Sequence, residues 1–123
     1  MSIPVDLDKL ADAVTDFDAG YLLTVSPEGK VKAVTVEPVV EAALVRIPGG
    51  SRGSAANLAD NPAVTLVYPP RERHGYTLIV DGVARVVEDG FEIAPDAAVL
   101  HRPADHADGP PAPGSCSNDC VRI

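Results

Sequence analysis

The chain has 123 residues, of which 46% are hydrophobic and 23% charged, so its composition is that of one globular domain with a real core and not of a disordered segment. The formal net charge of −8 argues against a general surface for nucleic acid or an anionic membrane, and any anion site must therefore be local. The sequence contains no apolar run of the roughly 20 residues that a membrane span needs and no signal-peptide pattern, so we expect a cytoplasmic protein, and its small size favours a dimer.

The first predicted element is a short amphipathic helix over residues 7–17, where apolar residues recur at helical spacing. A β-hairpin follows. It consists of an apolar strand over 21–25, a turn of Ser-Pro-Glu-Gly-Lys at 26–30, and a strand over 31–36 in which Val alternates with Lys, Ala and Thr.

Pro38 interrupts this alternation, and a third strand is predicted over 39–47. The sequence Pro-Gly-Gly at 48–50 ends that strand. A short helix of Ala, Asn and Leu is predicted over 54–60, and it ends there because the ring of Pro62 disfavours helical geometry at Asn61. A fourth strand follows over 63–68.

A polar turn at 69–75 leads to two strands over 76–80 and 83–87, which are bent or bulged at Asp81-Gly82, and to a last strand over 91–100. Six or seven strands with one or two helices and no regular βαβ alternation predict a mainly β protein. The expected architecture is an antiparallel barrel.

Residues 104–123 are predicted to form an extended Pro- and Gly-rich tail after a barrel domain of residues 1–103. Cys116 and Cys120 lie close together in this tail, and a disulfide between them would stabilise little of the fold, so reduced thiols are expected. With two nearby histidines they match no standard zinc spacing, and no metal site is expected.

The glycine-rich stretch from Gly50 to Pro62 is the strongest candidate for a binding site. Glycines let a backbone approach a ligand closely, serine hydroxyls donate hydrogen bonds, and a helix start offers unpaired N–H groups at the positive end of its dipole. Arg52 adds a permanently charged planar fork that suits phosphate oxygens. The pattern predicts a phosphate cradle, and its simpler alternative is a loop capped by Ser51 or Ser54 with Arg52 in solvent.

The order of strand, Gly-Ser-Arg, short helix and following strand resembles the pyridoxamine 5′-phosphate oxidase-like split β-barrel family. The resemblance spans about residues 5 to 103 and depends on the order and spacing of several short motifs. These motifs are Ser51-Arg52, Asn57-Leu58, Asn61-Pro62 and Val64-Thr65-Leu66-Val67, supported by the ending Val99-Leu100-His101-Arg102-Pro103.

The resemblance implies a homodimer of split barrels that binds FMN, or in some branches the deazaflavin coenzyme F-420, in two clefts lined by both subunits. By this resemblance, Arg52 takes the basic position that holds the cofactor phosphate, with Ser51 and Ser54 as hydroxyl partners. The other implied cofactor-binding positions are Val34, Thr35 and Val36 beside the ring, Ile47 and Gly49 near the ribityl chain, and Asn57 in the helix.

One departure from the family pattern concerns the phosphate. The oxidase itself carries a second basic residue after the arginine, whereas this chain has Gly53. Lys30, Lys32 or Arg46 could supply the missing charge, although strand alternation most simply places the two lysines on a solvated face. The substrate-phosphate residues of the oxidase have no counterpart in residues 108–123, so oxidation of pyridoxamine phosphate is not expected.

Three functions are open at this point. The first is a flavin- or deazaflavin-dependent oxidoreductase that acts on a small organic molecule; its cofactor performs hydride transfer, so no catalytic triad is needed. The second is a protein of the same fold that binds FMN or haem without turnover, and the third is a dimeric structural module. Tyr68, His74 and Tyr76 could contact a substrate or ring, but ordinary surface or core positions explain them as well.

Overall fold

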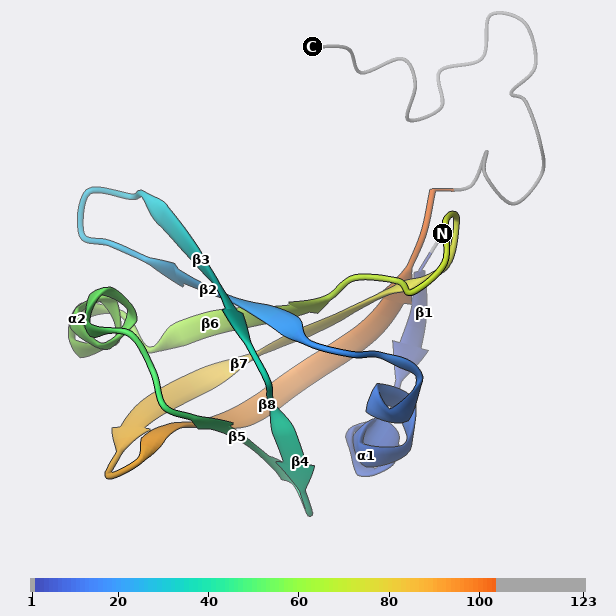
Figure 1. Cartoon of the computed structure of the whole chain (residues 1–123), viewed down its shortest axis with the longest axis horizontal. Helices are drawn as coiled ribbons and strands as arrows, with labels where there is room; N and C mark the ends of the chain where they lie inside the picture. The colour runs from blue at the N-terminus through green and yellow to red at the C-terminus, as the bar shows by residue number, and fades with distance from the viewer. Residues whose placement is uncertain (1, 104–123) are drawn as a thin grey trace, which may run out of the picture.

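A computed structural model describes residues 2–103, and all structural statements concern that part of the chain. It contains eight strands and two α-helices (Figure 1). Their bounds are β1 Ser2–Val5, α1 Leu10–Ala13, β2 Gly20–Val25, β3 Val31–Val36, β4 Val39–Glu41, β5 Leu44–Pro48, α2 Arg52–Asp60, β6 Ala63–Tyr68, β7 Thr77–Val87 and β8 Gly90–His101. The predicted tail, with Cys116 and Cys120, lies outside the described residues.

One antiparallel sheet holds all the strands, in the order β3-β2-β6-β7-β8-β5-β4, with β1 paired to β8. β7 and β8 pair along their whole lengths, from Thr77 opposite His101 to Val87 opposite Gly90. The beginning of β8 also pairs with β5, and its end pairs with β1. The prediction of a mainly β, antiparallel split barrel is confirmed, with one strand more than the six or seven expected.

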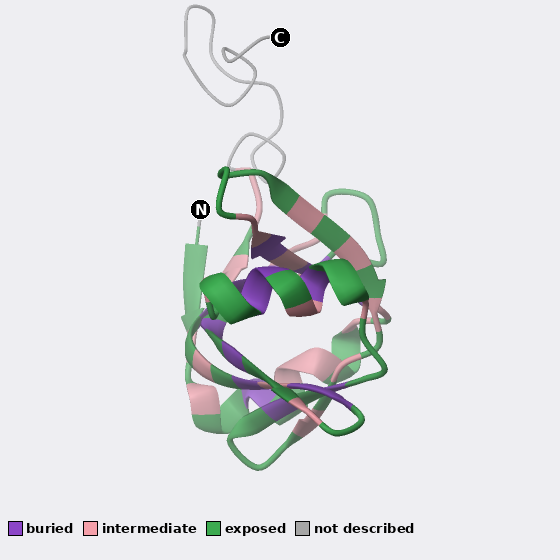
Figure 2. Ribbon diagram, turned by 90° about the vertical axis from the view of Figure 1, so that its left-hand side faces the viewer, coloured by how far each residue is buried: buried purple, intermediate pink, exposed green. Residues whose placement is uncertain are grey.

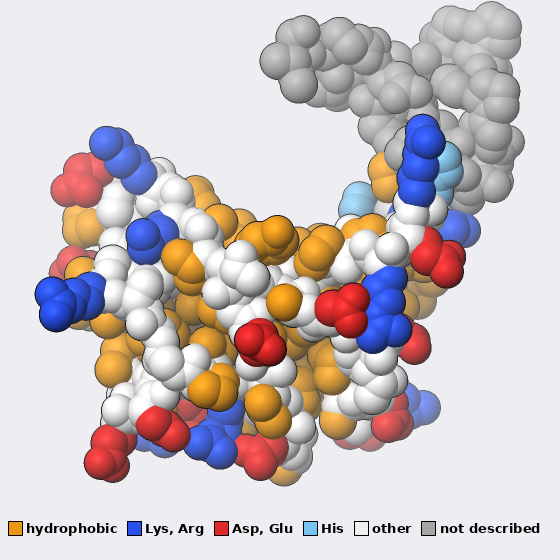
Figure 3. Space-filling model, viewed as in Figure 1, with side chains coloured by type: hydrophobic (Ala, Val, Ile, Leu, Met, Phe, Trp, Pro, Cys, Tyr) orange, Lys and Arg blue, Asp and Glu red, His pale blue; other side chains and the backbone are white. Residues whose placement is uncertain are grey.

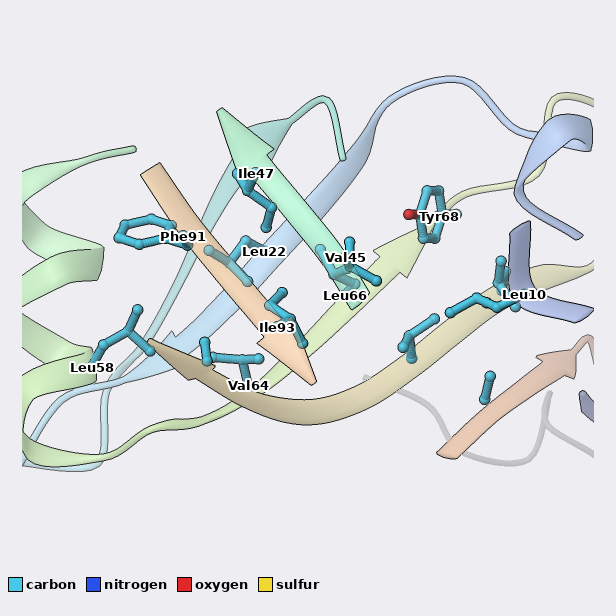
Figure 4. Close-up of a cluster of buried hydrophobic side chains, with 14 residues drawn as sticks. Leu10, Leu22, Val45, Ile47, Leu58, Val64, Leu66, Tyr68, Phe91 and Ile93 are labelled. Atoms are coloured by element: carbon cyan, nitrogen blue, oxygen red, sulfur yellow. The ribbon is translucent and has the colours of Figure 1, made fainter. Parts of the chain in front are cut away.

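The core fills the inner side of the curled sheet. The strand register places Leu22, Leu66, Val80 and Ala98 in one row across β2, β6, β7 and β8. All four side chains are buried, because every second residue of a strand points to the same face. Side chains from β5 and α2 belong to the same buried cluster, and Figure 4 shows Leu22 and Leu66 of the row together with Val45 of β5. Helix and sheet therefore share one apolar cluster.

The two helices lie at opposite ends of the curled sheet (Figure 1). α2 packs on β2 and β7, and Figure 2 shows it facing the viewer across one end of the sheet. Its buried residues are Ser54, Asn57 and Leu58. α1 lies near β4 and buries Leu10.

Three elements differ from the sequence prediction. The predicted strand over 39–47 is a hairpin of β4 and β5 that turns at Ala42, whose φ is +55°. Asn or Gly usually marks such a turn, and alanine gives no signal. The predicted helix over 7–17 contains only the single turn of α1 between two 3-10 turns. β1 was not predicted, because it is a short edge strand that contains Pro4.

β7 is one strand where two were predicted, and the predicted irregularity at Asp81-Gly82 is confirmed. Asp81 pairs with Ala97 whereas Gly82 pairs with Pro95, so β8 carries one extra residue, Asp96. This is the pattern of a β-bulge, which increases the local twist and helps the long hairpin of β7 and β8 to curl.

The turn between β7 and β8 brings Gly90 against the end of β5. Its φ is +154°, and an added Cβ would collide with the carbonyl oxygen of Ile47. Glycine therefore allows the first residues of β8 to pair with β5, and this pairing fixes the position of Phe91.

Gly90→Ala is expected to lower the free energy of unfolding by roughly 2–5 kcal/mol, because a left-handed backbone penalty adds to a steric clash. Gly29→Ala is the matched control: Gly29 also has a positive φ, +84°, but no atom lies within 4 Å of its added Cβ. The control should lose only about 1–2 kcal/mol. Urea unfolding measures both, and equal losses would show that the clash at Gly90 is relieved without cost.

Candidate functional site

The sheet does not close into a complete barrel, because β3 pairs only with β2 while β4 pairs only with β5. We call the gap between β3 and the β4–β5 hairpin the seam. A pocket of about 640 Å³ lies in it, which is within the ordinary range for small-molecule sites. Its lining residues are Val34, Thr35, Val36, Glu37, Val39, Pro48, Gly50, Ser51 and Phe91.

The pocket lies against the open edge of β3. It touches Val34 and Val36, which are half-buried, and also Thr35, which is exposed on the other face of the strand. In an antiparallel pair every second residue directs its N–H and C=O groups away from the partner strand. The edge of β3 therefore offers backbone donors and acceptors to a ligand in the seam.

Phe91 supplies an apolar wall of the pocket, and Gly50 packs closely against it. Gly50 has a φ of +133°, and an added Cβ would lie 2.9 Å from Cζ of the Phe91 ring. A side chain at position 50 would therefore push the loop away from the ring. The glycine keeps the loop before α2 close to the base of the pocket.

Ser51 is the N-cap of α2, as one alternative of the sequence analysis expected. Its Oγ accepts a hydrogen bond from the N–H of Ser54 at 3.0 Å and donates one to Oγ of Ser54 at 2.8 Å. The helix begins at Arg52, two residues earlier than predicted, and the Arg52 side chain is exposed. Its first turn contains no acidic residue, so no side chain of that turn offsets the positive end of the helix dipole.

The side chain of Lys32 crosses from β3 to the start of α2. A Cβ added at Gly53 would lie 2.7 Å from Cε of Lys32 and 3.1 Å from its Nζ. The lysine thus occupies the space that a side chain at position 53 would need. Lys32 is half-buried and lies on the same face of β3 as Val34 and Val36. The interpretation of the lysine face as solvated is therefore wrong for Lys32.

The ion pairs of the described residues involve other cations. Arg46 pairs with Glu41 at 3.1 Å and Asp89 at 3.3 Å, Arg71 with Asp18 at 3.0 Å, and Arg85 with Glu92 at 2.7 Å. Within residues 2–103 no ion pair joins Arg52 or Lys32 to a carboxylate. The hydrogen bond to Glu41 and the nearby carboxylates raise the pKa of Arg46. Its guanidinium is thus already paired and does not supply the second charge at the start of α2.

The nine predicted site residues fall into three groups. Four of them line the seam pocket, two line an adjoining hollow of about 390 Å³, and three are buried and line neither space. The four are Val34, Thr35, Val36 and Ser51, the two are Gly49 and Arg52, and the three are Ile47, Ser54 and Asn57. The pocket and the hollow share Gly50, Ser51 and Phe91, so they are neighbours.

Asn57 fastens α2 to the sheet. Its Nδ2 donates a hydrogen bond to Oγ1 of Thr24 at 2.9 Å, and both residues are buried. A polar pair in an apolar contact is stable only when its hydrogen bond is made. The pair therefore sets where α2 lies on β2, and with it the position of Ser51 and Arg52.

The sequence interpretation did not identify Glu37, Val39 or Phe91 as site residues. Phe91 reaches the pocket through the pairing of β8 with β5, which joins segments more than 40 residues apart in the chain. No local pattern signals such a contact.

Three further candidate residues lie away from the seam pocket. Tyr68 is in the core against Phe17, with ring centroids 5.9 Å apart, and burial raises the pKa of Tyr68 to about 12. Tyr76 lines a separate cavity of about 410 Å³, and the Arg102 guanidinium lies 4.4 Å from its ring centroid. His74 is exposed and lines neither space.

Two further site types were searched for among residues 2–103. No group of three or more His, Cys, Asp or Glu side chains is placed to hold a metal ion. None of the helices in this range has the length and hydropathy to cross a membrane.

The chain is similar to two uncharacterized mycobacterial proteins. These are Mb0449c of Mycobacterium bovis and MT0457 of Mycobacterium tuberculosis, each 37% identical over 95% of this chain and 93% of the relative. No protein-family model matches the chain.

Solved structures share the fold at low sequence identity. A Listeria innocua protein described as a candidate pyridoxamine 5′-phosphate oxidase has a TM-score of 0.64 at 15% identity, covering 76% of this chain and 96% of that one. The FAD binding protein of Mycobacterium smegmatis has a TM-score of 0.59 at 18% identity, covering 83% and 100%. An F-420 reductase has a TM-score of 0.58 at 15% identity, covering 71% and 94%.

Thr24→Val is expected to lower the free energy of unfolding by about 1–3 kcal/mol, because it leaves the buried amide of Asn57 without its partner. Thr65→Val is the control, since it breaks a hydrogen bond to Asp81 on the exposed side of the sheet and should cost less than about 1 kcal/mol. Urea unfolding of both variants tests the difference. A loss at Thr24 no larger than at Thr65 would contradict the fastening role of Asn57.

Proposed function

We propose that this chain, whose fold is that of the pyridoxamine 5′-phosphate oxidase-like split barrels, is a flavin- or deazaflavin-dependent oxidoreductase acting on a small organic molecule. The cofactor would be FMN or coenzyme F-420, held in the seam pocket with its phosphate at the start of α2. The observation that carries the proposal is the pair of Lys32 and Arg52, two cations without a carboxylate partner in the described chain, beside a mostly apolar pocket.

The residues of the site fit a phosphorylated planar cofactor. Gly53 leaves room for the side chain of Lys32, so the lysine ammonium reaches the start of α2. It could supply there the second positive charge that the oxidase carries at the position of Gly53. Two cations and unpaired helix N–H groups suit a phosphate dianion. The open edge of β3 and the wall formed by Phe91 suit a flat heterocycle with polar edges.

Each part of the chain then has a distinct task. Arg52 and Lys32 would hold the phosphate, and Ser51 would keep the helix start in place through its bonds to Ser54. The backbone of β3 would orient the ring, while Val34, Val36 and Phe91 exclude water from it. A bound flavin or deazaflavin supplies hydride transfer, so the protein needs to provide only position and environment.

We also propose that the active form is a homodimer. Large apolar side chains remain exposed on the monomer, and Figure 3 shows hydrophobic side chains gathered along its hollowed side. Val39, which lines the pocket, is 47% exposed, and Leu44 in the same hairpin is 38% exposed. A second copy that covers this hairpin would complete the pocket wall and remove apolar surface from water.

Fluorescence titration with FMN and F-420 tests the cofactor. The unmodified protein should bind one of them with micromolar or tighter affinity, and Arg52→Ala or Lys32→Gln should each weaken binding by about tenfold to a hundredfold through loss of a phosphate contact. Arg73→Ala, an exposed arginine in the 69–75 turn, is the control and should bind normally.

Riboflavin, which has no phosphate, separates phosphate recognition from a general loss of the site. Its affinity should be weaker than that of FMN and unchanged in the Arg52 and Lys32 variants. Unchanged FMN affinity in both variants would refute the phosphate site. If neither cofactor binds, the proposed activity is wrong and a structural module becomes the better description.

The dimer is tested by sedimentation equilibrium, which should give about twice the chain mass of 12.8 kDa. If the partner completes the pocket, cofactor binding and dimerisation are linked, so added cofactor should shift the monomer–dimer equilibrium toward the dimer. A monomer that binds cofactor with an affinity independent of protein concentration would contradict the shared cleft.

A further inference from the structure

We propose that Glu37 makes its own end of the seam pocket selective for a small apolar molecule that carries a protonated nitrogen, and that this end, away from the start of α2, disfavours carboxylates and phosphate groups. This inference depends on the proposed function, because it names the substrate class of the same pocket. Its basis is that Glu37 is the one charged side chain among the described residues that line the pocket.

The carboxylate of Glu37 is available to a ligand. The residue follows the last residue of β3 and is exposed, and no ion pair within residues 2–103 involves it. The next residue is Pro38, which restricts Glu37 to an extended backbone and so limits the directions that its side chain can take.

Neighbouring charges do not offset Glu37. Arg46 on β5 pairs across the hairpin with Val39, but its guanidinium is already held by Glu41 and Asp89. The other lining side chains are apolar or hydroxyl-bearing, and the chain as a whole is acidic. An incoming anion therefore meets an unfavourable potential at this end of the pocket, and a cation a favourable one.

Opposite charges therefore flank the pocket, because Glu37 lines it whereas Lys32, which does not line it, lies beside the start of α2. Lys32 lies near one end of β3 and Glu37 just beyond the other, five residues apart, or roughly 16 Å along an extended chain. If the cofactor phosphate is held at the Lys32 end, the acidic end is left for the reacting molecule. Apolar contacts with Val39 and Phe91 would hold its body, and the carboxylate would hold its charged nitrogen.

Three probes of the same ring size test this: benzylamine, benzyl alcohol and benzoate, which are cationic, neutral and anionic near pH 7. Their binding is followed by methyl NMR shifts of the pocket valines, on the full chain both without cofactor and with the cofactor that the fluorescence titration selects. Benzylamine should bind about fivefold more tightly than benzoate, with benzyl alcohol between them, as expected for a partly exposed charge pair. Raising the salt concentration should shrink this difference.

Glu37→Gln should bring the benzylamine-to-benzoate ratio close to one and leave benzyl alcohol unchanged, and Glu37→Lys should invert the order. Glu28→Gln is the matched control, because Glu28 is an exposed glutamate in the turn between β2 and β3 and does not line the pocket. The control should keep the original ratio.

A ratio near one in the unmodified protein, or a ratio that Glu37→Gln leaves unchanged, would overturn the inference, as would failure of all three probes to shift the pocket valines. None of these results depends on cofactor binding, because the titrations are also made without it. Failure to bind FMN and F-420 would instead refute the proposed activity, and the probe ratio would still decide the charge preference of the pocket.

Discussion

The incomplete closure of the sheet is the constraint on which the rest of the structure depends. Strand β5 pairs with β8 instead of β3, so β3 keeps an open edge and the seam between them becomes a pocket. An open edge is normally a liability, because its unpaired backbone groups can pair with another chain. In this fold the same groups face a cavity of ligand size, and the edge becomes a feature that a bound molecule can satisfy.

The helix that borders the pocket owes its position to packing. A nine-residue helix is marginal on its own in water, so α2 depends on its contacts with β2 and β7. The buried hydrogen bond between Asn57 and Thr24 adds direction to that apolar contact, since an amide and a hydroxyl must meet at one point. Core packing at one end of the helix therefore determines where its capped, positive end lies at the pocket.

Charge in this acidic chain is arranged so that a few groups stay available. Three arginines on or near the sheet are paired with carboxylates, whereas Lys32 and Arg52 both lie near the helix start and form no ion pair with a carboxylate within residues 2–103. Glu37, just beyond the far end of β3, is a carboxylate that forms no ion pair within residues 2–103. A carboxylate in the lining of a pocket and two cations beside that pocket can orient bound molecules through electrostatics.

Local patterns in the sequence determined most of the elements. The alternation in β2 and β3, the punctuation around α2, the strand β6 and the irregularity in β7 were all predicted, because each depends on residues close together in the chain. The Ser51-Arg52 motif likewise indicated a helix start nearby, although the helix begins two residues earlier than predicted. The tertiary structure alone decided what these pieces form together: Lys32 replaces the side chain missing at Gly53, Phe91 and Glu37 line the pocket, and Asn57 turns inward to Thr24. These contacts join segments far apart in sequence, and they follow from strand register and packing, which no local pattern specifies.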